Sequence, residues 1–531
     1  MLGENQLRII FNIDGHQSTL DSPNQNAFGI PATSVFMENS VVIEVPSIEG
    51  VYKGKLENGK IVGTWEQTGQ VFELILSKAD KSPDKSLAKR LTGEIKLPGG
   101  AGLNLTLKVY EDIKGNLSAT MDSPDQGAYG IKVSQIILDD ESLKFEVESI
   151  QGDYSGTYNP DSGFYAGTWK QAGSELPLNL KENYEEEEIL RPQEPERPFP
   201  YREENVSIFN KKAKINLAGT LTYPDSGKNF PAVVLISGSG PQNRDEEIFN
   251  HKPFLIISDY LTRNGIAVLR YDDRGVGESE GVFSEATTED FSYDAEAALE
   301  FLKTRKEIDT STIGLIGHSE GGLIAPMIAN RNDNVDFIIL MAGPGLPGDS
   351  IILRQSKLLM EAGGASEADI AKASELQKRI IDIVHSETDT LVIREKVVTA
   401  IKEMLEGTPE GEGTSETMIE AQAKRWVNNW MIYFLKYDPR PALRKIDIPV
   451  LAMIGEKDMQ VTSEENLSET KKALEKSEAS HFKLKELEGL NHLFQTAETG
   501  STSEYGQIEE TISPKALEMI LNFIKENAAL K

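Results

Sequence analysis

A serine at position 319 lies where an apolar stretch of the sequence changes directly into a helical pattern. The apolar residues Ile313–Ile316 come just before Gly317-His318-Ser319-Glu320-Gly321, and Gly322–Ala325 can begin a helix. The motif G-x-S-x-G is typical of a serine on a sharp turn from strand to helix, with its hydroxyl exposed at the end of the strand. It therefore predicts a serine nucleophile at Ser319, in a sheet that is covered by helices.

The same motif occurs a second time, at Gly277–Gly281. Its serine, Ser279, lies in a polar loop after Asp272-Asp273-Arg274, and neither an apolar strand nor a helix adjoins it. Because the motif needs both elements to expose a nucleophile, we predict that Ser279 is a loop residue. The charged groups of this segment predict internal salt links, although Arg244 and Arg274 could instead bind an acidic substrate.

From residue 201 onward, apolar runs alternate with helical segments. The runs that predict buried strands are Ala232–Ser237, Ile266–Tyr271, Ile313–Gly317, Phe337–Ala342, Val450–Ile454 and Phe482–Leu487. The segments that predict helices are Phe254–Arg263, Asp290–Thr304, Gly322–Asn330, Ser463–Lys476 and Pro514–Glu526. This alternation predicts an α/β fold with a parallel sheet covered on both faces.

The interval 346–444 breaks the alternation. Its pattern is helical and polar, and it is far too long for one crossover between strands. It therefore predicts a helical cap inserted over the C-terminal edge of the sheet. An aromatic-rich run in this interval could line a pocket for an acyl chain, but we favour packing inside the cap for its members: Trp426, Trp430, Met431, Tyr433 and Phe434.

A serine hydroxyl needs an adjacent base to act as a nucleophile at neutral pH. Three histidines follow the nucleophile: His385 in the predicted cap, His481 at the start of the last strand, and His492 in the loop after that strand. A loop after a parallel strand emerges at the same sheet edge as the serine turn. We therefore predict that His492 is the general base.

The base needs a carboxylate that fixes its tautomer and stabilises the imidazolium. Asp458 follows the predicted strand Val450–Ile454 at the correct edge. Glu456 is a less favoured substitute, and Asp447 precedes the strand at the wrong edge. The order serine, Asp458, His492 along the chain is that of the α/β-hydrolase triad.

The negative charge that develops on the substrate oxygen needs hydrogen-bond donors. One predicted donor is the backbone N–H of Glu320, after the nucleophile. The other comes from the loop 236–241 (ISGSGP), where two glycines let N–H groups turn inward; we choose Ser239, with Gly240 next. This loop lacks the G-x-x-x-x-G-K-[ST] pattern of a phosphate-binding loop.

The first 182 residues carry an internal repeat. Residues 19–30 (TLDSPNQNAFGI) match 120–131 (TMDSPDQGAYGI), and further matches end in two GTW motifs that contain Trp65 and Trp169. Short alternating runs between Gly, Asn and Asp turns predict two all-β copies of about six to eight strands each. The tryptophans could face a sugar or a lipid, but we favour a place in the core of each copy.

A segment rich in Glu and Pro, 183–200, follows these copies. Its composition predicts a stiff, solvated linker. The predicted organisation is thus a β repeat at 1–90, a second at 91–182, the linker, and a catalytic domain at 201–531.

Composition excludes several classes of function. The formal net charge is −30, which disfavours nucleic-acid binding. The absence of cysteine excludes thiol catalysis and cysteine metal sites. We expect no cofactor, no metal and no membrane span, and Met1–Ile10 shows no signal-peptide pattern. The oligomeric state stays open.

Residues 205–531 resemble the α/β-hydrolase superfamily, in particular bacterial esterases related to dienelactone hydrolases and acylaminoacyl peptidases. The motifs that carry the resemblance are SGSGPQNRDE at 237–246, YDDRGVGES at 271–279, GHSEGG at 317–322, GEKD at 455–458 and LNH at 490–492. One departure is Ser237, where that family usually has histidine before the oxyanion glycine.

The resemblance implies a carboxylesterase that acts on a small-molecule ester through an acyl-enzyme intermediate. A serine peptidase, thioesterase or acyltransferase on the same triad remains an alternative, as does a glycan- or surface-binding protein with a vestigial hydrolase domain. The β repeats resemble those of secreted or periplasmic enzymes from Bacteroidetes-like bacteria. This implies an exported bacterial protein whose signal peptide has been removed, with a cytoplasmic location also left open.

Overall fold

The computed structural model describes residues 10–529 except 15–16, 23–26, 38–39, 46–49, 58–59, 68–69, 78–84, 97–101, 113–115, 124–127, 140, 172–173, 184–189, 409–410, 412–413 and 480. Parts of the predicted repeat (23–26, 46–49 and 124–127) and of the predicted linker (184–189) lie outside the described residues. The chain forms two compact units, Met1–Ser86 and Leu87–Lys531, which are considered separately.

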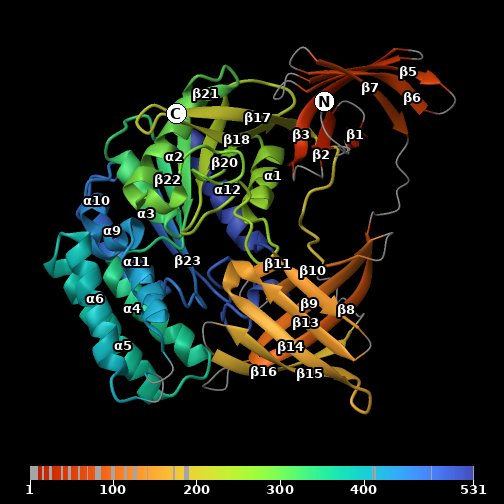
Figure 1. Cartoon of the computed structure of the whole chain (residues 1–531). Helices are drawn as coiled ribbons and strands as arrows, with labels where there is room; N and C mark the ends of the chain where they lie inside the picture. The colour runs from red at the N-terminus through yellow and green to blue at the C-terminus, as the bar shows by residue number, and fades with distance from the viewer. Residues whose placement is uncertain are drawn as a thin grey trace. The chain divides into compact units, whose positions relative to one another are not determined.

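The first unit contains a seven-stranded antiparallel sheet whose strands pair in chain order (red in Figure 1). Its strands are β1 (Ile10–Asp14), β2 (Gln17–Ser22), β3 (Ala27–Met37), β4 (Ser40–Val45), β5 (Gly50–Glu57), β6 (Lys60–Gln67) and β7 (Gln70–Ser77).

The second unit begins with a nine-stranded sheet, shown in orange in Figure 1. Its strands are β8 (Lys85–Lys96), β9 (Gly102–Asp112), β10 (Leu117–Ser123), β11 (Ala128–Lys132), β12 (Gln135–Leu138), β13 (Ser142–Val147), β14 (Gly152–Asn159), β15 (Phe164–Gln171) and β16 (Ser174–Glu182). The repeat boundary that we placed at 90/91 falls inside β8. The strand begins earlier because the alternating run from Lys85 to Lys96 is continuous.

This second sheet curls until its edges meet. The strand order is β11-β10-β9-β8-β16-β15-β14-β13-β12, so the two edge strands are consecutive in the chain. The Val133 N–H between them donates to the Ala119 carbonyl of β10 (3.1 Å), and the Ser134 N–H donates to the Glu146 carbonyl of β13 (2.7 Å). The chain thus passes directly from one edge strand to the other, and each of these two residues extends the pairing of its own strand.

Both β sheets bury the same Tyr–Trp pair. Tyr52 lies opposite Trp65 in β5–β6, and Tyr154 lies opposite Trp169 in β14–β15. Each tyrosine hydroxyl donates to backbone carbonyls of the next two strands. The exposed fractions of Trp65 and Trp169 are 5% and 2%. The tryptophans therefore close the cores, as we expected, and do not face a ligand.

Residues 190–200, the second half of the predicted linker, are fixed to the domain that follows. The Arg191 guanidinium donates to the carbonyls of Asn250 (3.1 Å), Gly506 (2.9 Å) and Ile508 (2.9 Å). The Thr511 N–H donates to the Gln193 side-chain oxygen (2.6 Å). This half is thus not the solvated spacer that composition predicted, because two polar side chains satisfy backbone groups of the domain.

The rest of the chain is built on an eight-stranded sheet, ordered β17-β18-β20-β19-β21-β22-β23-β24. Its strands are β17 (Tyr201–Asn210), β18 (Ile215–Pro224), β19 (Phe230–Ile236), β20 (Ala267–Tyr271), β21 (Ile308–His318), β22 (Phe337–Met341), β23 (Val450–Gly455) and β24 (Phe482–Leu487). Six neighbouring strands of this sheet are parallel to one another: β20, β19, β21, β22, β23 and β24. They match all six runs that predicted strands, and their C-terminal ends lie at one edge. The prediction of burial is wrong for β24, because it is an edge strand and only Leu487 in it is buried.

Helices cover both faces of this sheet (Figure 1). On one face, α1 (Pro253–Arg263) and α12 (Pro514–Ala529) bury an apolar core with the sheet. On the other, α2 (Thr288–Lys303), α3 (Gly321–Ala329) and α11 (Ser463–Leu474) do the same. The predicted α/β fold is confirmed.

The predicted cap lies between β22 and β23. Its helices are α4 (Gly348–Ala362), α5 (Glu367–Ser386), α6 (Thr390–Leu405), α8 (Glu416–Trp426), α9 (Asn429–Lys436) and α10 (Arg440–Leu443). The cap has a core of its own, which Trp426 and Met431 join as expected. A second apolar cluster, with Leu323, Ile351 and Phe434 at its centre, ties α4 and α9 to α3 of the main domain.

Replacing Trp169 with alanine should lower the free energy of unfolding of the second sheet by about 3–5 kcal/mol, because a buried indole leaves a cavity. Hydrogen exchange measured by mass spectrometry on peptides from β13–β16 reports this change. Replacing Ile137, which is 60% exposed, with alanine should alter protection by less than about 0.5 kcal/mol. Equal protection in the two variants would contradict a core role for Trp169.

Candidate active site

Ser319 occupies a tight turn between β21 and α3. Its φ angle is +51°, a left-handed conformation that costs a non-glycine residue about 1–3 kcal/mol. A Cβ on Gly317 would collide with the Gly321 carbonyl, and one on Gly321 would lie 2.2 Å from the Ile236 carbonyl oxygen. The Ser319 N–H donates to the Met341 carbonyl at 2.8 Å. The glycines of the motif are therefore needed because backbone crosses backbone at this turn.

His492 and Asp458 form a buried pair. The His492 Nδ1 lies 2.7 Å from the Asp458 Oδ2, and the Asp458 side chain is 0% exposed. The other carboxylate oxygen, Oδ1, accepts the N–H groups of Gln460 and Val461, each at 2.8 Å. One oxygen thus anchors the carboxylate to its own loop, while the other fixes the orientation of the imidazole.

The sheet brings these two loops to the serine. Asp458 follows β23 and His492 follows β24, so both loops leave the sheet at the edge where β21 ends in the Ser319 turn. The His318 Nε2, beside Ser319 in the chain, lies 3.0 Å from the His492 carbonyl oxygen. The two imidazole centroids are 5.0 Å apart. The His492–Asp458 pair and the Ser319 turn therefore lie at the same sheet edge, and His318, next to Ser319 in the chain, contacts the His492 backbone.

The loop after β19 lies against the nucleophile. A Cβ on Gly238 would be 3.3 Å from the Ser319 Cβ, and Gly240 has a φ of +94°. The Gly238 N–H donates to the Glu246 carboxylate at 2.7 Å. Among acceptors in the described part of the chain, neither the Ser239 N–H nor the Glu320 N–H has a partner. Both groups are thus available as donors.

Ser237, which begins the segment predicted to hold the oxyanion, is hydrogen-bonded to a buried carboxyl group. Its hydroxyl donates to the Asp273 Oδ1 at 2.9 Å, and the Gln242 N–H donates to Asp273 Oδ2 at 2.9 Å. Burial raises the pKa of Asp273 to about 8, and the neighbouring carboxyl groups of Glu320 and Glu246 add to the shift. A buried carboxyl group therefore supports the predicted oxyanion loop, residues 236–241.

The second G-x-S-x-G motif has a structural role. The Ser279 hydroxyl donates to the Asp272 carbonyl (2.7 Å) and accepts the Ala218 N–H (2.9 Å), and the residue is buried. Arg244 pairs with Asp272 (2.6 Å), and Arg274 with Asp294 (2.6 Å). These are the internal salt links that we predicted for this segment.

The other considered residues lie apart from the triad. His385 pairs with Asp349 inside the cap, and His481 packs beside the Phe523 ring. The Glu456 carboxylate accepts the Gly489 N–H (2.8 Å), and Asp447 is exposed before β23. None of them competes with Asp458 or His492 for its predicted role.

A hydrogen bond connects the cap to the serine turn. The Trp430 Nε1–H of α9 donates to the Glu320 carboxylate at 2.7 Å, and the Trp430 ring stacks on Phe434. Our expectation of cap packing therefore misses part of the role of Trp430. Burial raises the pKa of Glu320 to about 7, although the Trp430 bond partly opposes the shift. The sequence gives no sign of this pairing because the two residues are far apart along the chain.

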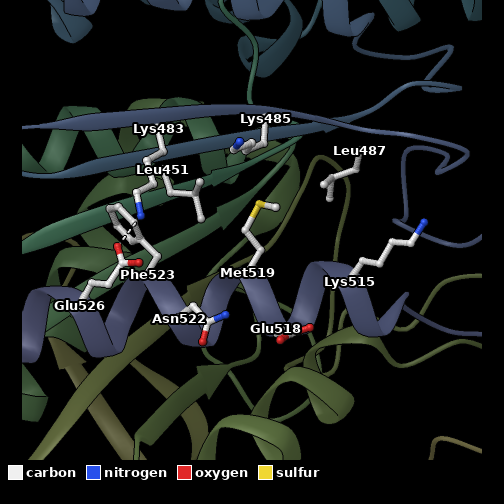
Figure 2. A pocket seen from close by; sticks show the side chains of 10 residues that line it. All are labelled: Leu451, Lys483, Lys485, Leu487, Lys515, Glu518, Met519, Asn522, Phe523 and Glu526. Atoms are coloured by element: carbon white, nitrogen blue, oxygen red, sulfur yellow. Dashed lines mark hydrogen bonds and ion pairs between the residues drawn. The ribbon is translucent and has the colours of Figure 1, made fainter.

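A separate groove of about 450 Å³ lies between β24 and α12 (Figure 2). Lys483 and Lys485 project from the strand and Lys515 from the helix, and Lys483 pairs with Glu526. The groove contains none of the triad residues. Among the described residues, no group of three or more His, Asp or Glu side chains could hold a metal ion. No helix in the described part of the chain is long and apolar enough to cross a membrane.

Two sequence comparisons found similar proteins. A family model described as "Serine aminopeptidase, S33" matches residues 254–410. Esterase EstD of Thermotoga maritima is 30% identical over 305 residues, which are 57% of this chain and 63% of that protein. The match thus spans less than two thirds of the relative.

Solved structures were also matched. The α/β hydrolase GrgF from Penicillium sp. sh18 is 16% identical, with a TM-score of 0.39 over 62% of this chain and 99% of that one. Esterase Pf2001 from Pyrococcus furiosus is 16% identical, with a TM-score of 0.36 over 61% of this chain and 93% of that one. The sheet order and the serine turn show that residues 201–531 have an α/β-hydrolase fold, and both sequence matches lie within this part of the chain or overlap it.

Replacing Glu320 with glutamine should flatten the pH dependence of stability. The folded carboxyl group (pKa about 7) keeps a proton that the unfolded one (pKa 4.5) loses. Wild-type stability should therefore fall by about 3 kcal/mol as pH rises from about 4.5 to about 7. Thermal unfolding at pH 5 and pH 8 measures the difference. Identical pH dependence in wild type and Glu320→Gln would contradict the assigned environment.

Proposed function

We propose that the α/β hydrolase formed by residues 201–531 is a carboxylesterase with the triad Ser319, His492 and Asp458. The observation that carries the proposal is the buried His492–Asp458 pair at the sheet edge where Ser319 occupies its strained turn. A serine, an imidazole and a carboxylate arranged in this order are the components of acyl transfer through a covalent intermediate.

The proposed reaction proceeds in two halves. His492 takes the proton of the Ser319 hydroxyl as its oxygen attacks the ester carbonyl, and Asp458 stabilises the imidazolium. The N–H groups of Glu320 and Ser239, with Gly240 next, hold the negative oxygen of the tetrahedral intermediate. His492 then gives its proton to the departing alcohol. In the second half, His492 activates water, which releases the acid and restores the serine.

Ester substrates are favoured over amides by the 30% identity to Esterase EstD. The family description of the 254–410 match names an aminopeptidase, so peptide hydrolysis is the second candidate. Comparing matched p-nitrophenyl esters with aminoacyl p-nitroanilides distinguishes the two. Thioester hydrolysis and acyl transfer to an alcohol would use the same acyl-enzyme intermediate. They are distinguished by measuring whether a thiol is released from a thioester and whether an added alcohol takes up the acyl group in place of water.

The β repeats are the candidate for any contact with glycans or surfaces. Trp65 and Trp169, which occupy matching positions in the two repeats, are buried. A glycan would therefore have to bind through other residues. We also propose that the protein is exported, to the periplasm or outside the cell. This proposal depends only on the resemblance of the β repeats to those of secreted or periplasmic enzymes.

Replacing Ser319 with alanine should lower kcat for p-nitrophenyl butyrate by about 10⁴-fold or more, because the covalent route is lost. Replacing Ser279 with alanine should leave a folded enzyme that is less stable by about 1–3 kcal/mol, since a buried hydroxyl with two hydrogen bonds is removed. Loss of activity in folded Ser279→Ala with retention in Ser319→Ala would reverse the assignment.

Replacing Asp458 with asparagine should lower kcat by about 10⁴-fold with little change in KM, because the imidazole is then held in the wrong tautomer. Steady-state kinetics with the same ester measures this effect. Replacing Asp447, exposed before β23, with asparagine is the matched control and should leave kcat unchanged. A drop of less than tenfold for Asp458→Asn would argue against the proposed triad.

A further inference from the structure

A second acid–histidine pair lies directly beneath the serine turn. Glu246 is 3% exposed and His318 is 6% exposed, and the Glu246 Oε1 lies 2.9 Å from the His318 Nδ1. Glu246 belongs to the loop that follows the oxyanion loop, where its backbone has a φ of +51°. Neither residue belongs to the proposed triad, and a strained backbone conformation at a buried acid calls for an explanation.

The pair connects three segments of the active site. The same Glu246 Oε1 accepts the Gly238 N–H of the oxyanion loop at 2.7 Å. The other ring nitrogen of His318, Nε2, lies 3.0 Å from the carbonyl oxygen of His492. His318 itself precedes Ser319 in the chain. One hydrogen-bonded chain thus runs from the oxyanion loop, under the nucleophile, to the backbone of the general base.

The groups that face the two ring nitrogens of His318 indicate its protonation state. Both ring nitrogens face acceptors, a carboxylate oxygen and a carbonyl oxygen, and only the imidazolium donates from both nitrogens. Burial lowers the pKa of His318, but Glu246 and the bond to His492 more than offset it, so the pKa is raised overall. The adjoining cavity, lined in part by Glu246 and His318, is about 10 Å³. It has room for at most one water molecule.

We propose that Glu246 and His318 are positioning residues that hold the oxyanion loop and the His492 backbone in register with Ser319. The proposal rests on the proposed esterase function. Neither side chain needs to touch the substrate. Small displacements of donors or base weaken the transition state far more than the substrate complex, so the pair acts on kcat and leaves KM nearly unchanged.

The test compares variants at Glu246 in p-nitrophenyl butyrate hydrolysis. Glu246→Ala leaves the Gly238 N–H and His318 without their shared partner, and kcat should fall about 100-fold with KM within about threefold. Glu246→Gln keeps an oxygen at the Oε1 position, which can accept both the Gly238 N–H and the His318 Nδ1–H. It should recover kcat to within about tenfold of wild type, as expected for positioning by geometry.

A matched control separates positioning from general stability. Asp294 is also buried and pairs with Arg274 at 2.6 Å, away from the triad. Asp294→Asn should lower the melting temperature while leaving kcat per folded molecule unchanged. If Glu246→Ala does not fold, Glu246→Asp replaces it, because the shorter side chain keeps the charge but withdraws from Gly238. An unchanged kcat in the folded variant would overturn the proposal.

Fluorophosphonate labelling of the full chain keeps this test independent of the substrate. The reagent reports the reactivity of Ser319 whatever ester or amide the protein acts on. If wild type labels but hydrolyses no ester, the proposed function fails while the positioning role is still read from labelling rates. Labelling of Glu246→Ala should be at least tenfold slower than wild type and restored in Glu246→Gln. Equal rates in all three proteins would contradict the positioning role.

Discussion

The active-site region depends on the left-handed backbone of Ser319 at the end of β21. This conformation is unfavourable by about 1–3 kcal/mol, so the surrounding structure has to enforce it. The enforcement comes from the Met341 carbonyl, which accepts the Ser319 N–H, and from the close approach of Gly322 to Gly343. Both partners come from β22 and the loop after it. The turn is therefore stable only when the parallel sheet has formed around it.

The same sheet edge gathers several buried carboxyl groups, and each has a different environment. Asp458 accepts two backbone N–H groups and pairs with His492. Glu246 pairs with His318. Burial raises the pKa of Asp273 to about 8 and that of Glu320 to about 7. Near neutral pH the last two are largely or partly protonated, so the negative field at the site is weaker than the formal count of acids implies. A developing oxyanion benefits from this reduction.

Much of this arrangement is predictable from local sequence. Ser319 stands between an apolar run and a helix-forming run, and Asp458 and His492 each follow a strand, so parallel-sheet geometry alone brings their loops together. Ser279 lies in a loop, as the absence of an adjoining strand or helix in the sequence predicts. The burial of Trp65 and Trp169 likewise follows from their place in alternating strands.

What the sequence does not reveal are contacts between distant loops. Glu246 lies in a polar stretch with no periodicity, and its link to His318 arises only when the loop after β19 folds under the serine turn. The bond between Trp430 and Glu320 crosses from cap to main domain. Arg191 belongs to a segment whose proline and glutamate content predicts a solvated linker, yet its guanidinium satisfies backbone carbonyls of Gly506 and Ile508. Such pairings are set by tertiary packing and leave no local pattern.

The central claim is that Ser319 forms the covalent intermediate. It is tested most directly by quenching the protein with acid within the first turnovers of p-nitrophenyl butyrate and mapping the butyryl group by peptide mass spectrometry. The account predicts that the acyl group is on the peptide that contains Ser319 and that it accumulates further when water is made limiting. An acyl group on Ser279, or turnover with no acylated peptide at any time, would contradict it.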